Sequence, residues 1–343
     1  MSVTIYDIAE HARVSIATVS RVFNEHPRVS EATRRRVFRV ADELGYEPHA
    51  SAQSLARKNT QIVSAVVPMM TSFFFMEVLR GMQDRLDESD HDLLVYAART
   101  LDRVDGQLAR ALQRGRADGM LLASTPITPS RARRLAASRR PLVLVDSYHE
   151  DFDSVTIDNV RGGADAVRHL LARGHERIGL LLPLAESVPG RDRLDGARQA
   201  LREADVDLDP QLVVRAEWDT EMHGFTRYAG YRAMQQLLAL PASERPTAVF
   251  ACADVMALGA LRAAREAGLS VPGDLEVVGF DDIESSAYVG LTTFRQPMVE
   301  MGTLATELLL RRMREPDTEP SHTVFAPRLV VRETTGAATT ALA

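Results

Sequence analysis

The chain has 343 residues, of which 45% are hydrophobic and 26% are charged. This composition is typical of a globular protein with two or three domains, and it excludes disordered, collagen-like and disulfide-stapled chains. No apolar run reaches the roughly 20 residues of a membrane span, and the first residues lack the pattern of a secretory signal. The single cysteine, Cys252, cannot form an internal disulfide, so we expect a cytoplasmic protein.

The net charge of -6 is divided unevenly along the chain. Residues 1–60 hold nine basic and seven acidic residues, so this segment carries +2 and the rest of the chain carries -8. Of the 41 basic residues only Lys58 is a lysine. The guanidinium of arginine makes two hydrogen bonds at once to a phosphate or carboxylate group, which suits anion recognition. A codon bias is the simpler explanation of the excess of arginine over lysine. The asymmetry indicates that the first 60 residues have a partner of their own.

Residues 4–46 show helical patterning in three short segments. Thr4 and Asp7 form a capping-box pattern for the first helix, and Ser15 can cap a second helix over residues 16–24. Ser30 can cap a third helix, which ends at Gly45. The tight turn between the first two helices predicts a helix-turn-helix unit, which exposes its second helix to the major groove of DNA.

From residue 61 onward, near-continuous apolar runs alternate with segments of helical periodicity. Apolar strands without alternation predict parallel strands that helices cover on both faces. About nine strands are expected, which is too many for one simple doubly wound sheet, so we predict two α/β subdomains. The expected strands cover residues 62–67, 93–97, 120–123, 142–145, 155–157, 178–182, 213–214, 248–251 and 276–280.

Motifs of enzymes are missing from the sequence. No Gly-x-Gly-x-x-Gly follows a predicted strand, the only lysine is not in a phosphate loop, and no Gly-x-Ser-x-Gly nucleophile elbow occurs. The nine histidines show no zinc-ligand spacing. The adjacent acids Asp281 and Asp282 are common on solvated loops. We therefore expect no catalytic residues, no metal and no cofactor.

Residues 4–10 (TIYDIAE) and 14–24 (VSIATVSRVFN) closely resemble the DNA-binding head of the LacI/GalR family of transcriptional regulators. The similarity continues through residues 29–30, 33–34, 43–46 and 48, and to residues 52 and 55–56. The resemblance implies a sequence-specific DNA-binding regulator, most simply a repressor, that binds a palindromic double-stranded DNA operator as a homodimer. The sequence lacks the heptad-bearing tail that some relatives use for tetramers, which favours a dimer.

The resemblance also assigns roles at the DNA. Ile16, Ala17 and Arg21 occupy the base-reading positions, where arginine suits a bidentate contact with guanine and the apolar residues suit thymine methyls. The positions that contact the DNA backbone are Tyr6, Ser15, Thr18, Ser20, Asn24, Ser30 and Thr33.

Residues 48–60 resemble the hinge helix and linker of the family. A segment of this length is too short to be a stable helix alone, so it would order on a partner. The resemblance places Ala52 and Leu55 in the minor groove, with Leu55 as a wedge at a central CpG step. An ordinary linker leucine is the alternative for Leu55. Ser51 stands where the family usually has a valine, which weakens the expected packing of hinge on hinge.

The resemblance extends to about Arg332, through residues 168–178, 254–260, 277–282 and 291–297. It implies a periplasmic-binding-protein-like effector domain made of two doubly wound parallel-sheet subdomains. We expect a head at 1–47, a hinge at 48–60, an effector-binding and dimerisation domain at 61–332 and a frayed tail at 333–343. Lobe one would hold about 61–157 and 293–319, and lobe two about 158–291 and 320–332.

The resemblance also places an effector site in the cleft between the lobes. Arg193 matches an arginine that grips the effector, Trp218 matches a ring-stacking position, and Asp146 and Asp281 are placed to accept hydroxyl hydrogen bonds. An aromatic platform, one arginine and two carboxylates are typical of a carbohydrate site. Core packing is the alternative for Trp218 and for the phenylalanines. The other effector positions are Ser72, Phe74, Phe75, Val78 and Gln296.

Two departures from the family pattern bear on the effector. Ala253 stands where sugar-responsive members often carry asparagine, and residues 221–231 form a longer stretch than usual. We expect a neutral mono- or oligosaccharide that controls DNA binding allosterically. The alternatives are an activator or global carbon-catabolite regulator, and a regulator with a purine, nucleoside or phosphorylated effector. A stand-alone sugar receptor would not need Arg21 or Leu55.

Overall fold

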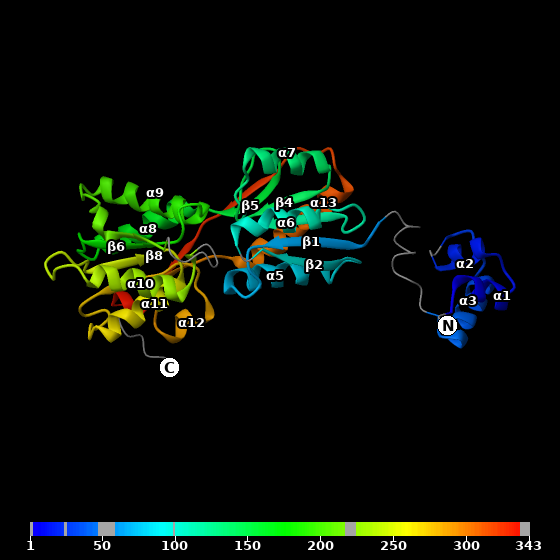
Figure 1. Ribbon diagram of the computed structural model, residues 1–343, viewed down its shortest axis with the longest axis horizontal. Coiled ribbons are helices and arrows are strands. Elements are labelled where there is room, and N and C mark those ends of the chain that lie inside the picture. Colours follow the sequence, from blue (N-terminus) through cyan, green and yellow to red (C-terminus); the bar gives the residue numbers. More distant parts are fainter. Residues whose placement is uncertain (1–2, 24–25, 47–58, 99, 217–223, 337–343) are drawn as a thin grey trace. The chain divides into compact units, whose positions relative to one another are not determined.

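The computed structural model describes residues 3–23, 26–46, 59–98, 100–216 and 224–336 (Figure 1). By its internal contacts the chain divides into two compact units. Met1–Ile62 and Arg114–Asp118 form one unit, and Val63–Gln113 and Gly119–Ala343 form the other. No helix within the described ranges is long and apolar enough to cross a membrane.

The described residues of the first unit form three helices, α1 (Ile5–His11), α2 (Ile16–Phe23) and α3 (Glu31–Leu44). The predicted caps form. The hydroxyl of Thr4 donates to Asp7 at 2.7 Å, and the Ser15 and Ser30 hydroxyls accept backbone N–H bonds at the starts of α2 and α3. Gly45 ends α3 in the left-handed conformation. The helices enclose a small core of Ile8, Ala9, Ala12, Val19, Val22, Val37, Val40 and Ala41. The predicted helix-turn-helix unit is therefore confirmed.

Asp118 anchors the chain where the linker ends. Its carboxylate accepts the backbone N–H groups of Thr60, at 2.9 Å, and of Gln61, at 2.7 Å. The predicted hinge residues Ser51, Ala52, Leu55 and Lys58 lie outside the described residues, as do Asn24 and Trp218.

Lobe one of the second unit is built on a six-stranded sheet with the strand order β11-β5-β4-β3-β1-β2. The pairs β1–β3, β3–β4, β4–β5 and β5–β11 are parallel. Helices α5 (Phe73–Leu86) and α13 (Met298–Arg314) cover one face, and α6 (Leu101–Ala111) and α7 (Pro129–Ser138) cover the other. The strands are β1 (Ile62–Val67), β2 (Asp92–Ala97), β3 (Gly119–Ala123), β4 (Leu142–Val145), β5 (Asp153–Ile157) and β11 (His322–Phe325).

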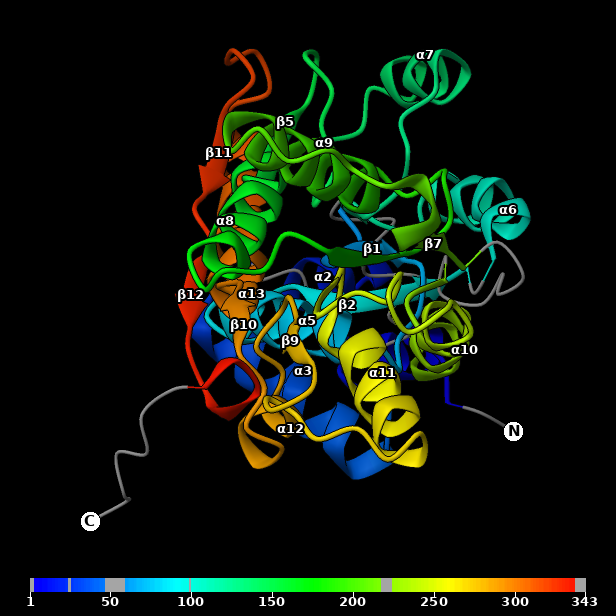
Figure 2. The same cartoon turned by 90° about the vertical axis from the view of Figure 1, so that its left-hand side faces the viewer.

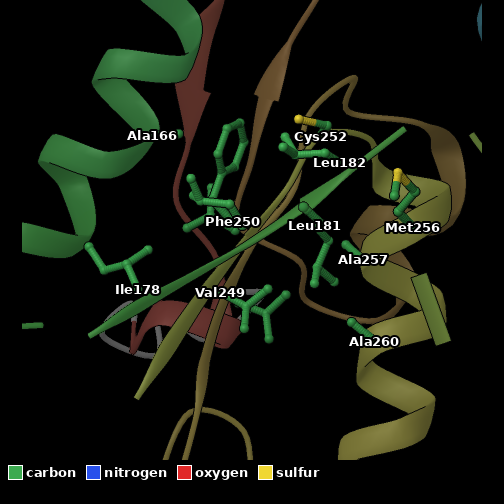
Figure 3. Packing of buried hydrophobic residues seen from close by; sticks show 14 of the residues in the cluster. Ala166, Ile178, Leu181, Leu182, Val249, Phe250, Cys252, Met256, Ala257 and Ala260 are labelled. Atoms are coloured by element: carbon green, nitrogen blue, oxygen red, sulfur yellow. The ribbon is translucent and has the colours of Figure 1, made fainter. Parts of the chain in front are cut away.

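Lobe two has a four-stranded parallel sheet with the order β7-β6-β8-β9. Helices α8 (Asn159–Leu171) and α9 (Val188–Glu203) cover one face, and α10 (Arg227–Leu238) and α11 (Asp254–Glu266) cover the other (Figure 2). Figure 3 shows its core, with Ala166 of α8 on one side of the strands and Met256, Ala257 and Ala260 of α11 on the other. The strands are β6 (Ile178–Leu182), β7 (Val213–Arg215), β8 (Ala248–Ala251) and β9 (Glu276–Val278), with short helices at Pro210–Leu212, α12 (Glu284–Tyr288) and Glu333–Thr335.

Three short strands were not predicted, and they change one expected boundary. Strand β10 (Thr293–Arg295) pairs antiparallel with β12 (Arg328–Val330). Strand β11 pairs in parallel with β5, so that Phe325 lies opposite Ile157. The lobe-one sheet therefore includes residues up to Phe325, and the expected return to lobe two near residue 320 is wrong. The chain returns later because β11 completes the sheet edge beside β5.

The expected frayed tail is also wrong at its start. Thr334 and Thr335 are buried, and the Thr334 hydroxyl donates to the carbonyl of Val277 at 2.7 Å. The backbone N–H of Thr292 in turn donates to the Thr334 hydroxyl at 2.8 Å. The threonine-rich composition suggested a solvated segment. Instead, the Thr334 hydroxyl makes hydrogen bonds to backbone groups of Val277 in β9 and of Thr292, so this segment packs beside β9. Residues 337–343 lie outside the described residues.

Three helix pairs pack so closely that only glycine fits at their contacts. In the α5–α13 pair, a Cβ on Gly81 would lie 2.0 Å from the carbonyl oxygen of Val299, and one on Gly302 would lie 2.0 Å from that of Val78. The α8–α9 and α10–α11 pairs repeat this reciprocal arrangement, at Gly163 and Gly196 and at Gly230 and Gly259. Each glycine therefore sets the distance between two helix backbones.

Gly302→Ala is expected to lower the free energy of unfolding by about 1–3 kcal/mol, because a methyl group at this contact forces α5 and α13 apart. Gly106→Ala on α6 is the matched control, since no heavy atom lies within 4 Å of a Cβ there. The control should gain up to about 1 kcal/mol from the higher helix propensity of alanine. Denaturant unfolding of the two variants measures both effects, and equal changes in the two would contradict the close contact.

Candidate functional site

One face of α2 is exposed in the way that base reading requires. Ile16 is 41% exposed, and Ala17 and Arg21 are exposed beside it, whereas Val19 and Val22 on the opposite face are fully buried. No ion pair within the described residues engages Arg21. This face is therefore open to a ligand along the length of α2.

Most of the predicted backbone-contact residues lie at or near helix starts in this unit. The Ser15 and Thr18 hydroxyls lie 2.9 Å apart at the start of α2, and the Ser30 and Thr33 hydroxyls lie 2.9 Å apart at the start of α3. Tyr6 in α1 is 67% exposed, and Ser20 is half-buried on α2. Helix N-termini with hydroxyl groups favour phosphate oxygens.

A cavity of about 70 Å³ lies where strand ends and helix starts of the two lobes meet. Seven of the predicted effector residues line it: Ser72, Phe74, Phe75, Asp146, Arg193, Asp281 and Gln296. Val78 does not, because it lies on the face of α5 that packs into the lobe-one core, where it is fully buried. Its prediction as an effector contact is wrong for this reason. Trp218 lies outside the described residues.

Arg193 is the only cation among the described residues that line this cavity. It projects from α9 and is buried, with its Nε donating to Asn159 Oδ1 at 2.9 Å and its Nη1 donating to the carbonyl oxygen of Cys252. Its guanidinium carbon lies 3.7 Å from the centre of the Phe280 ring, a cation–π contact. No hydrogen bond among the described residues occupies Nη2, so this edge of the guanidinium is left for a ligand acceptor.

Asp146 follows β4 and brings a carboxylate from lobe one. Its Oδ2 accepts the Ser124 hydroxyl at 2.6 Å, and Asn159 of α8 lies close enough to help lower the pKa of this carboxyl. Burial raises the pKa of Asp146 to about 6, against the opposing effects of the Ser124 hydrogen bond and the Arg193 charge. At neutral pH this group is therefore largely ionised.

Asp281 follows β9 and brings a second carboxyl group from lobe two. Its Oδ1 accepts the Gln296 side-chain amide at 2.6 Å. Burial raises the pKa of Asp281 to about 8; nearby Arg193 opposes the shift and Asp254 adds to it. At neutral pH this group therefore keeps its proton.

The backbone around the cavity is strained at several non-glycine residues. The backbone angle φ is 42° at Ser124, 52° at Asp146 and 129° at Asp281, all positive values that favour glycine. Gln296 Oε1 is buried without a hydrogen-bond partner among the described residues. Strain and unsatisfied polar atoms gather at functional sites, where a ligand or a conformational change uses them.

Comparison with known proteins now places the chain. Residues 4–49 match "Bacterial regulatory proteins, lacI family", and residues 167–335 match "Periplasmic binding protein-like domain". The chain is 34% identical over 334 residues to the ribose operon repressor of Haemophilus influenzae, covering 96% of this chain and 98% of that protein. The chain belongs to the LacI family.

Among solved structures, this LacI-family chain is similar to the lac repressor dimer bound to operator and the anti-inducer ONPF. The TM-score is 0.84 and the identity 29%, over 98% of this chain and 100% of that one. It is also similar to the cellobiose complex of the transcriptional regulator CelR, with a TM-score of 0.70 and 32% identity over 97% and 99% of the two chains. These relatives are DNA-binding regulators rather than enzymes, so the predicted class and fold are confirmed.

Several cavity residues of this LacI-family regulator were missed by the sequence analysis. Ser124 and Ser147 each stand at the carboxyl end of a strand region in lobe one, so the rule that ligands sit at strand ends could have found them. Asn159 does not line the cavity but accepts a hydrogen bond from Arg193, and nothing in the sequence indicated this because the two residues are 34 positions apart. The other missed lining residues are Pro68, Met69, Phe73, Pro126, Ser187, Val188, Pro189, Phe225, Val255 and Ile283.

No group of three or more histidine, cysteine and acidic side chains within the described ranges could hold a metal ion. Cys252 is buried, and burial raises the pKa of its thiol to about 12. A thiol that keeps its proton is a poor nucleophile and a poor metal ligand.

Proposed function

We propose that this LacI-family regulator is a homodimeric cytoplasmic repressor that binds a palindromic operator under the control of a neutral sugar. The observation that carries the effector class is the charge of the cavity. At neutral pH the described residues that line it supply one guanidinium, one ionised carboxylate and one protonated carboxyl group, at Arg193, Asp146 and Asp281. These charges sum to about zero, which favours a neutral ligand with hydroxyl donors and acceptors.

Gln296 Oε1 adds an acceptor that a ligand hydroxyl can satisfy. The half-buried Phe74, the buried Phe75 and Met69 supply apolar surface for the C–H faces of a ring.

The homodimer is supported by α12 and the residue after it, where Tyr288 is 82% and Val289 is 43% exposed in the isolated chain. It is also supported by the lac repressor relative, which was solved as a dimer bound to operator.

The test is selection of bound sequences from a random double-stranded DNA pool, with and without a panel of sugars. The proposal predicts a palindromic consensus and a change in its recovery with at least one sugar. Calorimetry with the same panel gives the affinity. A consensus that responds only to purines or to phosphorylated compounds would overturn the sugar proposal, and the absence of any palindrome would overturn the dimeric operator.

Arg21→Ala is expected to weaken binding to the selected operator by about 1–3 kcal/mol, because one bidentate guanine contact contributes roughly this discrimination. Nonspecific affinity should change little. Arg39→Ala is the matched control, since Arg39 is an exposed arginine of α3 in the same unit. Fluorescence anisotropy at one fixed salt concentration measures both affinities. Equal losses on operator and nonspecific DNA would contradict base reading by Arg21.

A further inference from the structure

A larger groove adjoins the small cavity. The groove has a volume of about 750 Å³ and shares six lining residues with the cavity: Met69, Ser72, Phe73, Phe225, Val255 and Ile283. These shared residues place the groove at the mouth of the cavity. We propose that the effector is a disaccharide, whose inner ring lies in the cavity beside Arg193 and whose second ring lies in this groove. This inference rests on the proposed sugar effector and extends it.

The sizes of the two spaces support a ligand that occupies both. A buried water needs roughly 10–15 Å³, so the cavity of about 70 Å³ admits roughly five to seven water-sized groups. This is fewer than the non-hydrogen atoms of a hexose. A sugar ring gripped by Arg193 therefore projects toward the groove even when it is a single ring, and a glycosidic bond at its outer end continues in the same direction.

The chemistry of the groove differs from that of the cavity. The cavity holds two carboxyl groups, whereas no acidic residue is among the described residues that line the groove. One wall of the groove consists of thioethers and an aromatic ring, with Met70 49% and Met76 46% exposed beside Phe73. Exposed methionines adapt to the shape of an apolar surface, and the C–H face of a sugar ring is such a surface.

Polar groups at the edge of the groove suit the hydroxyls of the second ring. Thr71, Ser285 and Arg227 line the groove together with the apolar wall. Ser72 lies at the junction of the two spaces, and its hydroxyl makes no capping hydrogen bond to α5. This hydroxyl is therefore placed to reach the region where a glycosidic oxygen would lie. An apolar surface with a few polar groups around it is the usual construction of a ligand site.

The experiment is calorimetric titration of the full chain with cellobiose, maltose and lactose, each compared with glucose and galactose. We expect at least one disaccharide to bind tenfold or more tightly than its component monosaccharides. Thr71→Trp and Ser285→Trp fill the groove from two different elements. Each should reduce the affinity for that disaccharide tenfold or more and reduce the monosaccharide affinity much less, because Thr71 and Ser285 line the groove and not the cavity. Tyr228→Trp, at an exposed position outside the groove, is the control variant.

The outcomes separate the groove from the cavity. A monosaccharide that binds as tightly as every disaccharide would overturn the groove proposal and leave the sugar effector intact. Disaccharide affinity that survives both tryptophan variants would also overturn the groove. Failure of all five sugars to bind the wild-type chain, while another class of compound binds, would overturn the sugar effector and the groove together. Circular dichroism of each variant identifies one that fails to fold, and the other variant then decides.

Discussion

Arg193→Met is expected to make DNA binding insensitive to the effector while the ligand-free protein keeps its operator affinity. Arg193 lines the cavity and links two elements around it, because it donates to Asn159 of α8 and to the carbonyl of Cys252 after β8. Hydrogen bonds to a charged group contribute about 1.5–3 kcal/mol each, so the loss of two ligand contacts lowers affinity by roughly 100-fold or more. Methionine keeps the apolar contact with Phe280, which limits the packing defect.

Calorimetry measures the effector affinity of this variant, and anisotropy measures its operator affinity with and without effector. Arg191→Met is the matched control. Arg191 lies two residues away on the same helix, but its side chain is 59% exposed and pairs with Asp192 at 3.5 Å. The control should bind and respond as the wild type does. An Arg193→Met protein that still releases or gains DNA on addition of effector would show that the cavity is not the regulatory site.

The second large effect is expected in the pH dependence of stability. Burial raises the pKa of the Asp281 carboxyl from 3.8, its ordinary value, to about 8 in the folded chain. Between these values the unfolded chain loses a proton that the folded chain keeps, so the free energy of unfolding falls as pH rises. The stabilising contribution is complete below about pH 4 and is lost by about pH 8, a change on the order of 5 kcal/mol.

Asp281→Asn removes this titration and is expected to flatten the pH profile of stability. Asparagine can still accept the Gln296 hydrogen bond, and Arg193, Asp254 and Asp146 remain around the position. At about pH 8 the variant should melt several degrees higher than the wild type, with a smaller difference near pH 5. Calorimetric melting across this range gives the slopes. Asp195→Asn, at an exposed position on α9, should leave the slope unchanged. Equal slopes for Asp281→Asn and wild type would contradict the raised pKa.

The elements that could be predicted from the sequence are those with a repeated local pattern. Strands such as β3 and β8 are wholly apolar and are followed by helical periodicity, so their buried, parallel character is visible in the residues themselves. Strands β10, β11 and β12 have three or four residues each and mix polar with apolar side chains. Their pairing depends on segments far away in the sequence, as when β11 pairs with β5, so no local sequence pattern predicts it.

The site was predictable where a residue's role follows from its place at a strand end or in a family motif. Asp146 and Asp281 both end strands, and both line the cavity. The prediction for Val78 failed because its position just after the first strand does not reveal which face of α5 the residue occupies. Asn159 and Phe280 were not predictable because each acts through Arg193, by a hydrogen bond and by a ring contact across the fold. The pKa of Asp281 follows from burial, which only the folded chain defines.

The reciprocal glycine contacts limit the kinds of motion that can carry the regulatory signal. In each of the three helix pairs, sliding one helix along the other by a residue would bring a side chain to a point where only a hydrogen atom fits. Shear between packed helices is therefore blocked within both lobes. Changes in the relation between the lobes must then be hinge rotations, absorbed by the few backbone bonds where the chain passes between them. We therefore expect effector binding to act through a small number of torsion angles rather than through gradual repacking of the core.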